Sequence, residues 1–121
     1  MNAERLMGVV AVLERTPDEA FDLGSWRCGS VACAVGHYVL AHPDRGLKLV
    51  PHIYSDELEG EGFVGWPSVE QHFQLSEKDA AYLFYQGAYR ADEDDEDLPV
   101  TRDEVAHRIR EYVASGGKAG A

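Results

Sequence analysis

The chain is poor in several features, and each shortage excludes a class of protein. It has 2 cysteines in 121 residues, too few for the dense disulfide framework of small secreted domains, so reduced thiols are expected. No apolar run approaches the roughly 20 residues that span a bilayer, and the N-terminal stretch carries no small-residue cleavage site. We therefore expect a cytoplasmic protein that makes no membrane contact.

Basic residues are also scarce. The sequence has 11 Lys and Arg against 22 Asp and Glu, which gives a formal net charge of -11 at pH 7. This charge repels phosphate backbones and anionic lipid, so we expect no direct nucleic-acid binding. The same charge suits a protein partner that is basic, although acidity also serves solubility alone.

Apolar residues are plentiful enough for a folded core. Hydrophobic residues make up 45% of the sequence, and its length is that of one domain. We expect a single helical domain over 1–115 and a flexible C-terminal tail over 116–121, because the tail is rich in glycine.

Apolar residues at helical spacing predict about five helices and hence a mainly α fold. The helices are expected over 3–15, 31–41, 67–73, 77–84 and 102–115. Ser76 and Thr101 are the expected N-caps of the last two, and Thr101 forms a capping box with Glu104.

The helix over 31–41 is expected to be the buried centre of the fold. Ser30 is its expected N-cap, and its residues are apolar on nearly every face. The insert over 47–65 is harder to assign, because Pro51 and several glycines weaken any central strand. It is expected to be irregular or to form a short β-hairpin around a loop over 57–62.

A short stretch, SWRCGSVACAVGH over 25–37, holds both cysteines. If Ser30 begins the helix, Cys28 lies just outside its N-terminus, where the helix dipole lowers the pKa of a thiol. Cys28 is then the catalytic candidate of a thiol-dependent hydrolase or transferase. Its base would be a distant histidine, namely His52, His72 or His107.

The same stretch suggests a second alternative, a small zinc-binding module. Cys28, Cys33 and His37 are its candidate ligands, with Cys33 and His37 one helical turn apart. The loop that usually separates two pairs of zinc ligands is missing. We therefore favour a packing role for Cys33 as a small buried residue, and expect no cofactor, with zinc as the alternative.

Six acidic residues follow one another over 92–97, shortly after a group of tyrosines. Mutual repulsion predicts an extended acidic loop over 91–99. Acidic side chains beside tyrosines can imitate a phosphate track and occupy the nucleic-acid-binding surface of a basic protein. The candidate binding residues are Tyr82, Tyr85, Tyr89, Asp92, Glu93, Asp94, Asp95, Glu96 and Asp97.

Two motifs carry a resemblance to other proteins. The first is C-G-[ST]-x-A-C-x-x-G-[WH] over 28–37, and the second is L-[ST]-x-x-[DE]-A-x-x-L-F over 75–84. Together they resemble small uncharacterised proteins of bacteria and their phages. The resemblance covers about a third of the chain and implies that the two segments pack together, but it implies no activity. His37 stands where similar proteins have Trp, which argues against an obligate metal role there.

These observations favour a non-enzymatic, cytosolic protein-binding or regulatory module of phage or mobile-element origin. Its expected partner is a basic protein toward which it mimics nucleic acid. The thiol enzyme and the zinc module remain the alternatives.

Overall fold

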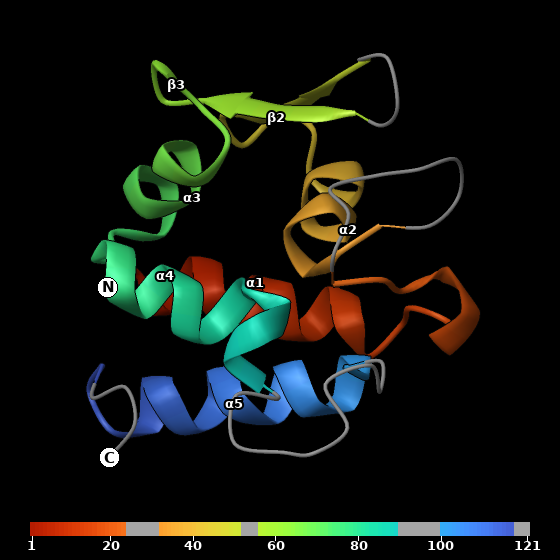
Figure 1. Ribbon diagram of the computed structural model, residues 1–121, viewed down its shortest axis with the longest axis vertical. Coiled ribbons are helices and arrows are strands. Elements are labelled where there is room, and N and C mark those ends of the chain that lie inside the picture. The colour runs from red at the N-terminus through yellow and green to blue at the C-terminus, as the bar shows by residue number, and fades with distance from the viewer. Residues whose placement is uncertain (24–31, 52–55, 90–99, 118–121) are drawn as a thin grey trace.

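The computed structural model describes residues 1–23, 32–51, 56–89 and 100–117 (Figure 1). This part of the chain forms five α-helices, two short 3-10 helices and a three-stranded antiparallel sheet. The mainly α prediction is confirmed. In chain order the elements are α1 Ala3–Leu13, η1 Asp18–Ala20, α2 Ala34–Ala41, β1 Leu47–Val50, β2 Glu57–Gly60, β3 Phe63–Val64, α3 Trp66–Phe73, α4 Glu77–Phe84, η2 Gln86–Tyr89 and α5 Arg102–Ala114.

Helix α1 lies between the other layers of the fold. It packs against α5 on one side and α2 on another, and the sheet lies at the far end of the molecule from α5 (Figure 1). Its apolar stripe, expected from the i, i+3, i+4 spacing, is buried at Leu6, Val9, Val10 and Leu13. One hydrophobic core therefore joins the helices.

The beginning of α2 corrects the sequence analysis. The helix begins at Ala34 with Cys33 as its N-cap, not after Ser30. Ala32 instead forms a parallel bridge with Phe21, because its amide donates to Ala20 O and its carbonyl accepts from Asp22 N, both at 3.0 Å. These bonds hold Ala32 in an extended conformation and delay the helix. Ser30 itself lies outside the described residues.

The insert over 47–65 forms three strands in the order β1-β2-β3 instead of a simple hairpin. The central strand, β2, falls where the sequence analysis placed a loop. In Glu57–Gly60 the acidic residues alternate with Leu58, which is fully buried and pairs with Leu49. This period-2 alternation is a strand signal that the nearby glycines obscured.

The remaining helices begin where their caps predict. Pro67 lies in the first turn of α3, and Ser76 Oγ accepts from Asp79 N at 3.1 Å at the start of α4. The capping box of Thr101 and Glu104 is formed at α5. Among the described residues, no helix has both the length and the apolar character needed to cross a membrane.

Candidate functional site

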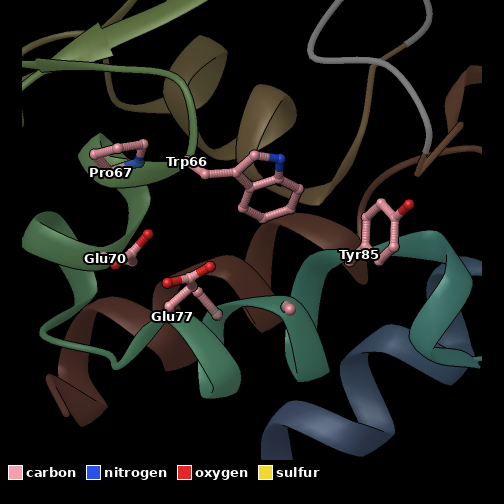
Figure 2. Close-up of a pocket in the computed structure, with 7 residues that line it drawn as sticks. Trp66, Pro67, Glu70, Glu77 and Tyr85 are labelled. Atoms are coloured by element: carbon pink, nitrogen blue, oxygen red, sulfur yellow. The ribbon is translucent and has the colours of Figure 1, made fainter.

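A pocket of about 490 Å³ opens between α3 and α4 (Figure 2). Both helices contribute to its walls, and the residues that line it are Trp66, Pro67, Glu70, Glu77, Ala80, Ala81 and Tyr85. Its volume lies within the range typical of ligand-binding pockets in proteins. We take it as the candidate functional site in the described part of the chain.

The pocket follows from the way α3 and α4 are connected. Gln74 adopts the left-handed conformation, with φ 54°, and Leu75 N bonds back to Glu70 O, so the chain turns sharply between the helices. In such a helical hairpin the start of the first helix lies beside the end of the second. Trp66 is thereby brought to Tyr85, and Glu70 to Glu77.

One end of the pocket is aromatic. The ring centroids of Trp66 and Tyr85 are 6.2 Å apart and nearly perpendicular, at 80°, an edge-to-face geometry that aromatic pairs favour. Tyr85 is 56% exposed. Gly87 gives its ring room, because a Cβ at Gly87 would lie 2.9 Å from Tyr85 Cε1. The lack of a side chain at Gly87 therefore permits the Tyr85 ring to lie beside the pocket.

The other end is acidic. Figure 2 shows Glu70 and Glu77 on the side of Trp66 away from Tyr85, and both residues line the pocket. In the described ranges neither carboxylate forms a hydrogen bond or an ion pair with another residue. The pocket thus presents two like charges that no described cation neutralises.

Only part of the predicted tyrosine surface is available to a partner. Tyr85 is exposed, but Tyr89 is buried and its hydroxyl donates to Leu83 O at 2.6 Å. Burial raises the pKa of the Tyr89 phenol. Tyr82 is half-buried beneath the Arg108 guanidinium. Asp92, Glu93, Asp94, Asp95, Glu96 and Asp97 lie outside the described residues.

The structure places Cys33 in the core. Its Sγ accepts a hydrogen bond from Gly36 N at 3.4 Å, as the N-cap of α2, and the side chain is buried. Burial raises the pKa of the Cys33 thiol to about 11 despite that bond, so a thiolate is disfavoured. A buried thiol with a raised pKa is a weak nucleophile and a weak metal ligand, so these observations favour the packing role for Cys33. Cys28 lies outside the described residues.

The side chain of His37 links two segments of the fold. Its Nε2 lies 2.6 Å from Ala20 O and donates to it, which ties α2 to the segment that follows α1. In the ranges that the structure describes, no group of three or more His, Cys, Asp or Glu side chains is placed to hold a metal ion.

A buried polar network around His72 was not anticipated. His72 is fully buried; its Nε2 lies 3.0 Å from Tyr38 Oη and its Nδ1 lies 3.1 Å from Glu61 Oε1. A neutral imidazole with its proton on Nδ1 satisfies both contacts, since Tyr38 then donates to Nε2 and Nδ1 donates to Glu61. Arg5 Nη1 donates to His72 O at 2.8 Å. The i, i+3 spacing of Val69 and His72 on the apolar face of α3 was the available signal.

This network predicts a pH-dependent stability. Burial, the largest cause, lowers the pKa of His72 from its ordinary 6.5. Between the lowered folded pKa and the ordinary 6.5, the unfolded chain therefore binds a proton at His72 that the folded protein does not, so stability falls as pH falls from 6.5 through this window. We expect a loss of up to about 1.4 kcal/mol per pH unit from this residue, measured as the free energy of unfolding in urea between about pH 7 and pH 5.

The control is His72→Gln, whose amide oxygen can still accept from Tyr38 but does not titrate. The variant should show a shallower pH dependence than the parent protein across that window. Equal slopes for the two proteins would show that His72 is not the group responsible.

Comparisons with known protein families, curated proteins and solved structures gave no match. No family model matches the chain, and no curated protein or solved structure is significantly similar to it. Functional inference therefore depends on the geometry and charge of the pocket.

Proposed function

We propose that this chain is a non-enzymatic module that binds a basic protein partner through the α3–α4 pocket. The observation that carries the proposal is the pair of carboxylates, Glu70 and Glu77, at one end of a pocket whose other end is aromatic. Two carboxylates that line one pocket concentrate negative charge there, which favours a bound cation. A positively charged group on a partner supplies such a cation.

The charge balance of the fold supports a basic partner. Much of the scarce positive charge is used within the chain itself, by Arg5, Lys48, Arg102, Arg108 and Arg110, each of which bonds to a described residue. Glu70 and Glu77 have no such partner among the described residues. The net charge of -11 accelerates the approach of a cationic surface.

The acidic run over 92–97 extends this proposal to nucleic-acid mimicry. Six successive acidic residues form a dense run of negative charge, as the phosphates of a nucleic-acid backbone do. Bound to a basic surface, the module would exclude nucleic acid from it, which is a regulatory effect.

The proposal is tested with two labelled peptides, one of alternating Arg and Gly and one of alternating Lys and Gly. We expect both to bind in fluorescence anisotropy, with affinity falling on the order of tenfold between about 50 and 200 mM salt. The chain should also displace a short DNA duplex from either peptide.

A variant with Asn or Gln in place of the acidic residues at 92–97 should associate more slowly and show a flatter salt dependence, because its steering charge is reduced. If neither peptide binds the parent protein, the chain is not a module for basic partners. An unchanged salt dependence in the variant would remove the acidic run from the proposal.

A further inference from the structure

We propose that the α3–α4 pocket recognises an arginine side chain, with the guanidinium held between the aromatic end and the two carboxylates. This inference rests on the proposed function and names the chemical group that the pocket selects. The arginine site depends on the pocket residues alone. It can therefore be wrong even if the chain does bind basic partners.

The aromatic end suits a guanidinium better than an ammonium. An Arg guanidinium is planar and weakly hydrated, so it stacks on an aromatic face, whereas the Lys ammonium is a strongly hydrated point charge. The rings of Trp66 and Tyr85 are nearly perpendicular, and a planar cation can stack on the face of either ring, where the ring quadrupole is negative. Within the chain, Arg108 already makes such contacts, with its Cζ 3.7 Å from the Tyr89 ring centroid.

The acidic end suits the hydrogen-bonding pattern of arginine. A guanidinium has five N–H donors in a flat fork, and it can therefore donate to two carboxylates at once. Glu70 and Glu77 project from different helices toward the same space (Figure 2). A Lys ammonium can also lie between the two carboxylates. It has no flat face, however, so it cannot stack on Trp66 while it donates to both carboxylates.

The shape of the pocket agrees with a long side chain. Ala80 and Ala81 of α4 contribute small side chains to its lining, and such apolar surface accommodates the aliphatic stem of an arginine. The volume of about 490 Å³ leaves room for the residues that flank it in a peptide.

The experiment compares the Arg–Gly and Lys–Gly peptides by isothermal titration calorimetry, together with a citrulline–Gly peptide that keeps the shape of arginine without its charge. We expect the Arg peptide to bind about tenfold more tightly than the Lys peptide. The citrulline peptide should bind more weakly than either.

Variants of the pocket residues test whether the affinity for the Arg peptide depends on the pocket. Glu70→Gln with Glu77→Gln should reduce Arg-peptide affinity at least about tenfold. The matched control is Glu19→Gln with Asp103→Asn, which removes the same charge from two exposed residues in η1 and α5, neither of which lines the pocket. This control should lose only the small part of the affinity that depends on net charge.

The aromatic end is tested with three variants of low structural cost. Tyr85→Phe keeps the ring and should keep the affinity, whereas Tyr85→Ala should lose several-fold. Gly87→Ala places a Cβ against the Tyr85 ring and displaces it, so it should weaken binding without touching the ligand. Thermal unfolding of each variant confirms that the fold is retained.

Equal affinity for the Arg and Lys peptides, with the pocket double variant behaving like its control, would overturn the arginine site and leave the proposed function in place. Loss of binding in the pocket variants with no preference for arginine would also overturn it, because the pocket would then select charge alone.

Discussion

Gly60→Ala is expected to destabilise the protein by about 3 kcal/mol, measured as the free energy of unfolding in urea. A Cβ at Gly60 would lie 2.4 Å from Gly46 O and 2.6 Å from Leu47 Cδ2. Gly60 pairs directly with Leu47 across β1 and β2, so the carbonyl cannot move without breaking the register. The cost is steric, because the nearest obstacle, Gly46 O, belongs to the backbone and cannot rotate away as the Leu47 side chain can.

Gly62→Ala is the matched control. Gly62 has φ 83°, which alanine adopts with strain, but a Cβ there would have no atom within 4 Å. Its expected cost is about 1 kcal/mol. If Gly62→Ala costs more stability than Gly60→Ala, then β1 and β2 do not approach each other at Gly60 as closely as the structure indicates.

Arg108→Met is expected to cost about 3 kcal/mol as well. The Arg108 guanidinium lies 4.4 Å from the ring centroid of Tyr82 and 3.7 Å from that of Tyr89. Its Nη1 also donates to Tyr82 O at 3.0 Å and Ala88 O at 3.2 Å. Methionine keeps much of the stem but leaves both carbonyls without this donor, and the interaction between cation and rings is lost. Calorimetric unfolding measures the effect.

Arg110→Met, on the same helix, provides the comparison. Arg110 pairs with Glu14 at the surface, where both side chains are about half exposed, and an exposed ion pair contributes at most about 1 kcal/mol. If the two substitutions cost the same, the Arg108 contacts do not stabilise the attachment of α4 and η2 to α5.

The Arg108 contact also bears on the pocket. It anchors the α4–η2 segment that carries Tyr85, and the opposite wall depends on Gly65, whose φ of 71° permits the turn from β3 into α3. The pocket is thus built on elements fixed from both sides. Such support is what a site needs to bind with selectivity.

Local signals in the sequence were reliable where one residue determines one end of a helix. Ser76, Thr101 with Glu104, and Pro67 each marked the start of a helix, because a cap satisfies amide groups within three residues of itself. The prediction that α2 begins after Ser30 is wrong, because Ala32 forms a β-bridge with Phe21, eleven residues earlier in the chain. A local rule cannot detect a competing bond of that kind.

The candidate site was less predictable. Tyr85 was named with Tyr82 and Tyr89 as one surface, yet Tyr89 lies in the core and Tyr82 beneath Arg108. Nothing local in the sequence distinguishes Trp66, Glu70 and Glu77 from ordinary residues of amphipathic helices. Their proximity depends on the turn at Gln74, which has a left-handed conformation in a residue other than glycine.

The sequence by itself determined the acidity of this protein, its mainly helical character, the apolar face of α1 and the starts of its last three helices. These follow from composition and from interactions between residues close in the chain. Only the tertiary structure decided where α2 begins, which strand is central, that His72 is buried against Tyr38, and that two aromatic rings and two carboxylates share one pocket. Those outcomes depend on contacts between distant segments, whose free energies compete with local preference and here exceed it.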